Sequence, residues 1–173
     1  MEDILLSGGV VVMRTDTLYG LLALASNEQA VKRVYTLKGR DSHKPPIVLV
    51  ADISQMFDPP DQQTELLLRT VWPGKVSVVV KSLNAPNWIT RNGTTVAYRI
   101  PNDNRLLKIL KKTGPLIAPS ANPQSMPPAT TIVEAQNYFQ GKVDWYEDTG
   151  TIKDNTPSSL IRLLADGTIE KIR

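Results

Sequence analysis

The most chemically informative part of the sequence is a loop that carries three cations within seven residues. Lys38, Arg40 and Lys44 surround the end of a predicted helix at Gly39, and an apolar run begins at Ile47. Lysine supplies a compact charge, and the planar guanidinium of arginine can hold two phosphate oxygens at once. Such a cluster can stabilise charge that develops on a phosphate under attack. Taken alone, the loop is more often a solvated basic turn, so other residues must decide.

Two other pairs of polar residues follow predicted strands, where open α/β sheets usually collect their ligand sites. Thr15 and Thr17 come after one short apolar run, and Ser120 and Asn122 come after another. On extended backbone the two threonine hydroxyls point to opposite sides, so we expect at most one of them to face a ligand. Ser120 and Asn122 can donate and accept hydrogen bonds without adding charge. Each pair is also consistent with a simple polar turn.

Arg99 lies near the end of a predicted strand in which larger apolar residues alternate with Ala97 and Arg99. An arginine held on a strand is rigid and can clamp a carboxylate through two parallel hydrogen bonds. The alternative is a charge exposed on an edge strand. Both interpretations stay open from the strand pattern alone.

Several familiar sites are absent from the sequence. There is no G-x-x-x-x-G-K-[ST] phosphate loop, no G-x-G-x-x-G dinucleotide motif and no G-x-S-x-G nucleophile elbow. The chain has no cysteine and a single histidine, His43, which excludes thiolate and multi-histidine metal sites. A nucleotide would therefore be held by cations and hydroxyls instead of a glycine-rich loop.

Length and composition set broad limits on the function. The 173 residues, 41% of them hydrophobic, suit one compact domain. The net charge of +3 suits an anionic ligand but is too small to indicate nucleic-acid binding by itself. No apolar run approaches the roughly 20 residues of a membrane-spanning helix, and the acidic start does not resemble a secretory signal. With the lack of cysteine, these features fit a cytoplasmic protein that does not enter membranes.

The elements that must position these residues follow from the hydrophobic pattern, which predicts an α/β class with a mixed, twisted sheet. A loop is expected at residues 15–20. Strands are predicted at residues 10–13, 47–50, 76–80, 95–100, 116–118, 160–164 and 168–172, the last two joined by an Asp166-Gly167 turn. Helices are predicted to start at the caps Ser26, Asp61, Asn102 or Asp103, and Thr131, with glycines at positions 39, 114 and 141 ending three of them.

Several segments, in an order and spacing that span nearly the whole chain, resemble the YrdC/TsaC family of threonylcarbamoyl-AMP synthases. Each segment is weak alone, but five in register are specific. The matching segments are Thr15-Asp16-Thr17-Leu18-Tyr19-Gly20-Leu21, Lys38-Gly39-Arg40 with Lys44-Pro45, Trp72-Pro73-Gly74, Val96-Ala97-Tyr98-Arg99-Ile100-Pro101, and Ser120-Ala121-Asn122. A weaker match is Pro157-Ser158-Ser159-Leu160 with the closing Lys171-Ile172-Arg173.

The resemblance implies a single YrdC-like domain over residues 1–173, with a twisted mixed sheet and flanking helices around a positively charged cavity. It implies an enzyme that joins L-threonine, bicarbonate or CO2, and ATP into L-threonylcarbamoyl-AMP and pyrophosphate. That product would serve the threonylcarbamoyl modification of tRNA adenosine 37, through a downstream tRNA-modifying threonylcarbamoyl transferase complex. Mg²⁺ is expected to arrive with ATP, because the sequence shows no dedicated carboxylate cage.

The resemblance also implies which residues bind the substrates. Lys38 and Arg40 would contact the ATP phosphates and carry the catalysis, with Lys44 as a third cation. The remaining nucleotide contacts would come from Thr95, Ser120, Asn122 and Arg173. Threonine would be held by Thr15, Arg99 and Ser158, with Arg99 taking its carboxylate. No residue is expected to bind a metal.

The sequence departs from the family pattern at three places. Arg14 stands where proline is usual, Pro123-Gln124-Ser125 replace the common x-Ser-Gly, and Pro157 replaces an acidic or small residue. The sequence ends at Arg173, so we expect the C-terminal domain of the longer relatives to be absent, and any lid to come from this domain or a partner.

The main alternative is a non-catalytic RNA-binding or RNA-maturation module. Two features favour it, namely the small excess of basic over acidic residues and the weak RNA affinity suggested for the family. A basic helix with Arg105, Lys108, Lys111 and Lys112 could meet RNA, although a solvated helix face explains it more simply. A different acyl- or carbamoyl-adenylating enzyme on the same scaffold is a third hypothesis.

Overall fold

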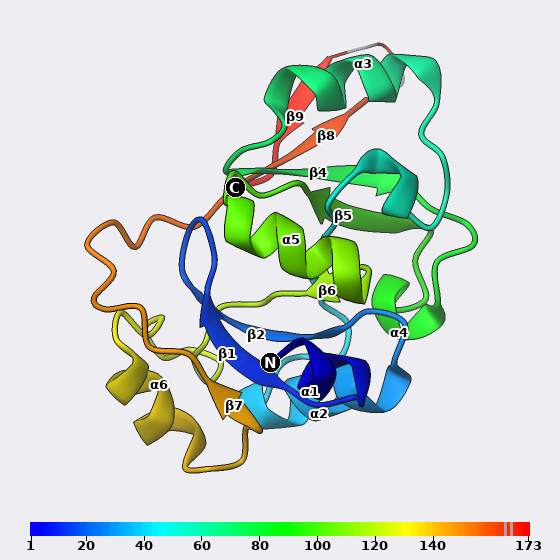
Figure 1. Cartoon of the computed structure of the whole chain (residues 1–173). Coiled ribbons are helices and arrows are strands. Elements are labelled where there is room, and N and C mark those ends of the chain that lie inside the picture. Colours follow the sequence, from blue (N-terminus) through cyan, green and yellow to red (C-terminus); the bar gives the residue numbers. More distant parts are fainter. Residues whose placement is uncertain (165, 167) are drawn as a thin grey trace.

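A mixed sheet of nine strands organises the part of the chain that the computed structural model describes, which is residues 1–164, 166 and 168–173. The strands lie side by side in the order β7-β1-β2-β6-β3-β5-β4-β8-β9 (Figure 1). Their bounds are β1 Val11–Arg14, β2 Tyr19–Leu24, β3 Ile47–Leu49, β4 Val76–Lys81, β5 Thr95–Arg99, β6 Leu116–Ile117, β7 Trp145–Tyr146, β8 Ser159–Leu163 and β9 Ile169–Lys171.

Helices pack on both faces of the sheet. Their bounds are α1 Glu2–Leu6, α2 Glu28–Lys38, α3 Gln62–Val71, α4 Asn87–Thr90, α5 Asn104–Thr113 and α6 Ile132–Phe139, with a 3₁₀ turn at Ile53–Gln55. One buried cluster joins α1 and α5 to one sheet face through residues such as Leu5, Leu22 and Leu106. A second cluster joins α2, α3, α4 and α6 to the other face, through residues such as Leu21 and Val34.

Strand β2 corrects the expected loop at residues 15–20. All six of its residues are buried, with Leu21 in one core cluster and Leu22 in the other. A strand covered on both faces is a continuous apolar run without alternation, so its pattern is weak. Strand β1 pairs with β2 up to Arg14 and Tyr19, which leaves only residues 15–18 as the connecting loop. The short elements α1, α4 and β7 were also not predicted.

Side-chain caps set most helix starts as predicted. The caps Asp61, Asp103 and Thr131 are confirmed, since each accepts a backbone N–H from its first turn. The cap predicted at Ser26 is wrong by one residue, because the Asn27 side chain accepts the N–H of Ala30 at 3.0 Å. Helix α6 ends at a left-handed Gln140, one residue before the predicted glycine.

The C-terminal hairpin is confirmed by the antiparallel pairing of β8 and β9. In the predicted Asp166-Gly167 turn, Gly167 lies outside the described residues. Among the helices that the structure describes, none is both long and apolar enough to cross a membrane.

Gly39 ends α2 in the left-handed conformation, with φ of 58°, and the cationic loop begins there. A Cβ at this position would meet no atom within 4 Å, so only the backbone conformation penalises a side chain. We expect Gly39→Ala to lower the free energy of unfolding by about 1–2 kcal/mol, and Gly39→Asn to lower it less. Denaturant titration measures both variants, and an alanine variant as stable as the wild type would contradict this account.

Candidate active site

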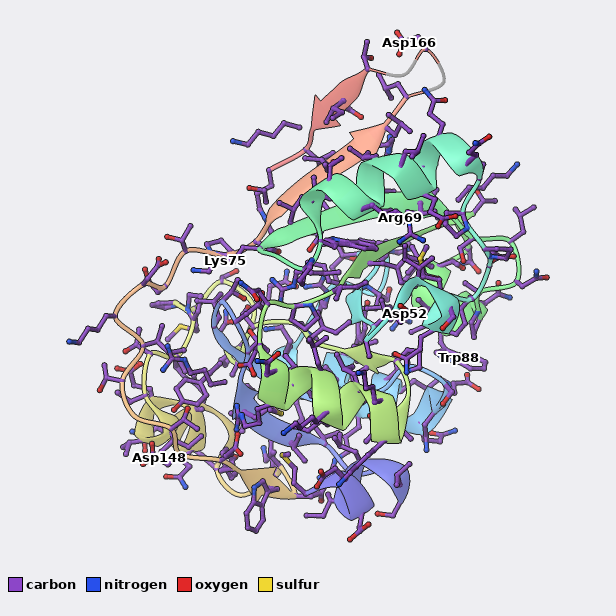
Figure 2. The ribbon with its side chains drawn as sticks, turned by 45° about the horizontal axis from the view of Figure 1, so that its top comes forward. Asp52, Arg69, Lys75, Trp88, Asp148 and Asp166 are labelled. Atoms are coloured by element: carbon purple, nitrogen blue, oxygen red, sulfur yellow. The ribbon has the colours of Figure 1, made fainter. Side chains whose placement is uncertain are left out.

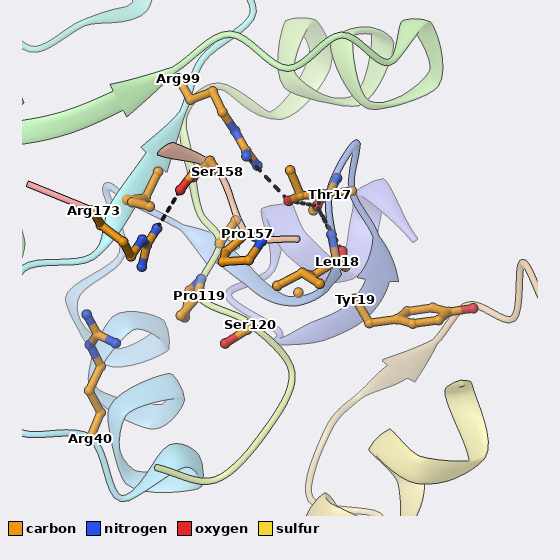
Figure 3. A pocket seen from close by; sticks show the side chains of 14 residues that line it. Thr17, Leu18, Tyr19, Arg40, Arg99, Pro119, Ser120, Pro157, Ser158 and Arg173 are labelled. Carbon is orange, nitrogen blue, oxygen red and sulfur yellow. Dashed lines mark hydrogen bonds between the residues drawn. The ribbon is translucent and has the colours of Figure 1, made fainter. Parts of the chain in front are cut away.

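A cavity of about 120 Å³ lies over the sheet face at β3, β5 and β6, and the loop of residues 15–18 and the segment at residues 157–158 close it (Figure 3). Strand β6 runs antiparallel to β3, whereas β5 runs parallel to it. Residues that follow β5 and β6 therefore leave the sheet at opposite ends, and the cavity spans the distance between them instead of lying at one edge. Its lining residues are Thr15, Thr17, Leu18, Tyr19, Gly20, Arg40, Ile47, Arg99, Ala118, Pro119, Ser120, Pro157, Ser158 and Arg173.

Six of the ten predicted site residues line this cavity, namely Thr15, Arg40, Arg99, Ser120, Ser158 and Arg173. Thr95 does not reach it, because it lies opposite Lys81, four residues before Arg99 and so about 13 Å away along the strand. Lys44 is exposed on the cationic loop, outside the lining. Lys38 and Asn122 are buried directly behind the cavity wall.

The two threonines of the 15–18 loop face the same place, contrary to the expectation that they would diverge. Their hydroxyl oxygens lie 3.1 Å apart, and the Thr15 hydroxyl also donates to the Leu18 carbonyl at 2.8 Å. The expectation assumed extended backbone, but these residues form a tight turn closed by the bond from Thr15 N–H to Leu18 O. Both hydroxyls therefore belong to the cavity wall.

Arg99 is a buried guanidinium held from two sides, so the alternative of an exposed edge charge is wrong. Its Nη2 lies 3.1 Å from Asp16 Oδ1, with both side chains under 5% exposed at 4% and 3%. Its Nη1 donates to the Thr17 hydroxyl at 3.3 Å (Figure 3). Burial lowers the pKa of Arg99, whereas the Asp16 charge raises it. Arg99 Nε has no hydrogen-bond partner among the described residues, which leaves one buried donor beside the cavity.

Lys38 fastens the loop that carries Ser120 and Asn122. Its ammonium donates to the carbonyls of both residues at 2.5 Å and lies 3.3 Å from Asn122 Oδ1. The residue is only 3% exposed, and burial, followed by the charge of Arg40, lowers the pKa of Lys38 to about 7. The Lys38 ammonium therefore lies directly behind the cavity wall. Burying its positive charge lowers the free energy of unfolding.

The depressed pKa of Lys38 predicts a pH dependence of stability. Between its native pKa of about 7 and its usual value of 10.5, the unfolded chain binds more protons than the native chain. The Lys38 contribution to the free energy of unfolding should therefore rise with pH in this window. Urea titrations at pH 7 and pH 9 measure the slope. Lys38→Met should show a smaller rise, and an equal rise in both proteins would contradict the assignment.

The cationic loop is folded by its own backbone acceptors. The Arg40 guanidinium donates to the carbonyls of Lys44 and Pro45, at 3.3 and 3.0 Å. The Tyr35 hydroxyl donates to the same Lys44 carbonyl at 2.6 Å. Arg40 is partly exposed, and its side chain lines the cavity together with that of Arg173 (Figure 3).

Gln124 joins the two loops that carry the predicted nucleotide residues. Its backbone N–H donates to the Lys38 carbonyl at 2.6 Å, and its side-chain oxygen accepts the Asp41 N–H at 2.8 Å. The Asn122 amide donates to the carbonyls of Pro123 and Met126. The unusual Pro123-Gln124-Ser125 segment thus replaces the expected loop with one that is tied to the cationic loop.

The remaining wall comes from the C-terminal part of the chain. Buried Ser158 shares a 3.0 Å hydrogen bond with Ser77, and its carbonyl accepts from Arg173 Nη2 at 3.0 Å (Figure 3). The backbone of Arg173 pairs with Leu160. These bonds place a third guanidinium group, after those of Arg40 and Arg99, at the cavity.

The segment between β7 and β8 crosses the surface from Asp148 to the region of Lys75 (Figure 2). Lys75 Nζ lies 2.9 Å from Asp154 Oδ2, and the Tyr19 hydroxyl donates to the Gly150 carbonyl at 2.8 Å. This segment ends at Pro157, so these two contacts help to hold one side of the cavity.

Eight lining residues were not among the predicted site residues, namely Thr17, Leu18, Tyr19, Gly20, Ile47, Ala118, Pro119 and Pro157. Most of them lie next to predicted residues within the same motifs. Membership in those motifs was therefore the sequence signal that could have identified them. Asp16 was noticed in the sequence but given no role, although it neutralises Arg99. Ile47 and Ala118 are ordinary apolar strand positions that no chemical pattern distinguishes.

The comparisons with known proteins decide the family. The Sua5/YciO/YrdC family model, described as "Telomere recombination", matches residues 3–173. This chain belongs to the Sua5/YciO/YrdC family. The Sua5/YciO/YrdC match confirms the resemblance drawn from the motifs.

Relatives of this Sua5/YciO/YrdC chain carry the name threonylcarbamoyl-AMP synthase. The Pseudomonas fluorescens Pf0-1 protein is 35% identical over 170 residues, which cover 94% of this chain and 90% of that protein. The Bacillus subtilis 168 protein is 33% identical over 163 residues, which cover 91% of this chain and 47% of that protein. The chain thus spans about half the length of the relatives from Bacillus subtilis and Pyrococcus abyssi.

Among solved structures, Pyrococcus abyssi Sua5 complexed with L-threonine superposes with a TM-score of 0.90 at 31% identity. The match covers 99% of this chain and 52% of that one. The predicted α/β class with a mixed sheet and flanking helices is therefore confirmed as the Sua5/YciO/YrdC fold.

Proposed function

We propose that this chain is an L-threonylcarbamoyladenylate synthase, which makes L-threonylcarbamoyl-AMP and pyrophosphate from L-threonine, bicarbonate or CO2, and ATP. The observation that carries the proposal is the cavity itself. One wall holds a buried guanidinium, Arg99, with an unpaired donor beside two threonine hydroxyls. The opposite wall offers Arg40, Ser120 and Arg173. Family membership and the names of the relatives support the same activity.

The proposed reaction balances without any oxidant or reductant. The threonine nitrogen forms a bond to the carbon of CO2 and loses a proton, which gives a carbamate. A carbamate oxygen then bonds to the α-phosphorus of ATP, while the bond from that phosphorus to the α,β-bridging oxygen breaks. The electron pair leaves with pyrophosphate. Such a transfer needs alignment and charge neutralisation more than an acid–base residue.

On the threonine side, the substrate carboxylate would accept hydrogen bonds from Arg99, whose free Nε is a ready donor. The hydroxyls of Thr15 and Ser158 would fix the rest of the amino acid. Asp16 already neutralises one side of Arg99. The arrival of a carboxylate would then place Arg99 between two anions, which favours its charged form.

On the nucleotide side, Arg40 and Arg173 would stabilise the phosphates, and Ser120 would supply a neutral hydrogen bond. Lys38, with Asn122, would act from behind the Ser120 loop, where its ammonium can exchange a carbonyl for a phosphate oxygen. The cavity volume of about 120 Å³ is below the roughly 300–1,000 Å³ of pockets for drug-sized ligands. The cavity would therefore hold the reacting centre, while the nucleotide extends outward past Arg40, towards the exposed Lys44.

Mg²⁺ is proposed to reach the site on the ATP phosphates. Among the described residues, no group of three or more His, Asp or Glu side chains could hold a metal ion. The carboxylate of Asp16, which lies between the lining residues Thr15 and Thr17 in the sequence, is already paired with Arg99. Magnesium commonly binds through substrate phosphates and water, so this donor set fits an ion carried by the nucleotide and supplying charge neutralisation there.

The product would pass to a downstream transferase complex that modifies adenosine 37 of tRNA. The proposed compartment is the cytoplasm, where ATP and tRNA occur together.

Mass spectrometry of a reaction with threonine, bicarbonate and Mg-ATP tests the activity directly. The expected result is the mass of L-threonylcarbamoyl-AMP, with pyrophosphate release that requires both threonine and bicarbonate.

A parallel titration with tRNA separates the enzyme from an RNA-binding module. Tight, salt-sensitive tRNA binding without threonine-dependent turnover would contradict the proposed activity. Serine and other amino acids in place of threonine, and carbamoyl phosphate in place of bicarbonate, would expose a different adenylating enzyme.

A further inference from the structure

A groove lies on the outer side of the cationic loop, between α2 and α4. Its volume is about 440 Å³, and its lining residues are Lys32, Tyr35, Thr36, Gly39, Arg40, Ser42 and Arg91. No carboxylate is among these residues. Arg40 lines both this groove and the cavity described above. The groove and the cavity are therefore neighbours that share a single guanidinium as a wall.

Two guanidinium groups gather around one aromatic ring in this groove. The central carbon of Arg91 lies 3.7 Å from the centre of the Tyr35 ring, and that of Arg40 lies 5.6 Å from it. Each contact is a favourable cation–π interaction. Two like charges at one ring nevertheless repel each other, and an anion placed between them would relieve that repulsion.

Arg91 lacks the partners that a half-buried arginine usually has. Its Nε and Nη2 are buried, and neither has a hydrogen-bond partner among the described residues. No ion pair joins it to a carboxylate within that part of the chain, whereas Lys32 pairs with Glu28 at 2.7 Å. Arg91 also adopts the left-handed conformation, with φ of 54°. Two buried guanidinium donors without acceptors, on a half-buried arginine that has no carboxylate partner among the described residues, are consistent with a site for an anionic ligand.

We propose that this groove is a second phosphate site, which takes a diphosphate group through Arg91, Arg40 and Lys32. In the reaction above, the bond between the α-phosphorus and the bridging oxygen breaks, and the diphosphate departs with the electron pair. Because Arg40 lines both the cavity and the groove, a diphosphate that left the cavity past Arg40 would meet Arg91 in the groove. The inference rests on the proposed function only for the origin of the diphosphate, not for its binding.

Calorimetric titration of the 173-residue chain with sodium pyrophosphate tests the site directly, without turnover. We expect Arg91→Gln to weaken pyrophosphate binding at least 10-fold, and Lys32→Gln to weaken it about 3-fold. Lys111→Gln, on the last turn of α5, removes the same charge far from the groove and should change the affinity less than twofold. Arg91→Lys keeps the charge and should recover part of the affinity. Circular dichroism of each variant checks that it folds.

A parallel titration with ATP distinguishes the two sources of the diphosphate. If Arg91→Gln weakens ATP and pyrophosphate equally, the groove holds the tail of bound ATP. If it weakens pyrophosphate alone, the groove receives the released product. The inference would be overturned if folded Arg91→Gln and Lys32→Gln bound pyrophosphate as tightly as the wild type. It would also be overturned if these variants bound tRNA more weakly while their pyrophosphate binding was unchanged. A failed product assay would reject the proposed activity and leave this binding result unaffected.

Discussion

Replacing Lys38 by alanine is expected to reduce threonine-dependent pyrophosphate release by about 100-fold or more, which is the usual cost of losing one preorganised charge or donor at a developing anion. Lys38 acts at two levels. Its ammonium fixes the carbonyls of Ser120 and Asn122, and in the proposed function its buried positive charge also stabilises a phosphate. The alanine variant loses both, whereas Lys38→Arg keeps the charge in a shape that does not fit three close acceptors.

Stability must be measured alongside activity in these Lys38 variants. Removing the ammonium leaves buried carbonyls without donors, at a cost of about 1–3 kcal/mol each, but it also removes a costly buried charge. We therefore expect the free energy of unfolding of Lys38→Met to change much less than the activity. Lys111→Ala on α5 is the matched surface control. Turnover by Lys38→Ala within threefold of the wild type would show that Lys38 serves only the loop.

Replacing Arg99 by alanine is expected to raise the KM for threonine at least 100-fold and to lower the free energy of unfolding by about 3–5 kcal/mol, because breaking a buried ion pair strands the other charge. The stranded group is Asp16, whose side chain is 3% exposed. Steady-state kinetics measures the first effect and urea denaturation the second.

A double variant separates the two effects of Arg99. In Asp16→Asn with Arg99→Ala no charge is stranded, so we expect most of the stability to return while threonine binding stays weak. Arg162→Ala breaks an exposed pair with Glu170 and should cost at most about 1 kcal/mol. If the double variant bound threonine like the wild type, Arg99 would be a structural residue only.

Most of the helices and strands, and several of the residues that line the cavity, could be predicted from the sequence. Caps such as Asp61 and Asp103 have a local mechanism, in which a side-chain oxygen accepts a nearby backbone N–H, so they could be predicted from a few residues. Strand β2 could not, because burial on both faces removes the alternation that marks a strand. The motifs pointed to Thr15, Arg99 and Ser120, and the fold brings all three to one cavity.

Side-chain partners were beyond the reach of the sequence. Lys38 was expected to point at phosphate, but its present acceptors are carbonyls from a loop about eighty residues later in the chain. The pairing of Asp16 with Arg99 and the contact of Gln124 with Asp41 also join segments that are far apart in the sequence. Whether Lys38, Lys44 and Thr95 contact ATP stays a prediction, since none of the three lines the cavity.

The strand order β7-β1-β2-β6-β3-β5-β4-β8-β9 has a consequence for how the protein acquires its binding site. Strand β1 pairs with β7, and β4 pairs with β8, so both pairings join distant parts of the chain. Such pairings require costly loop closure and form slowly. A nascent chain cannot complete the cavity before β8 and β9 leave the ribosome, because Ser158 and Arg173 beside these strands line it. Substrate then binds only the finished fold, and at 100 times its Kd it would add about 2.7 kcal/mol to the free energy of unfolding.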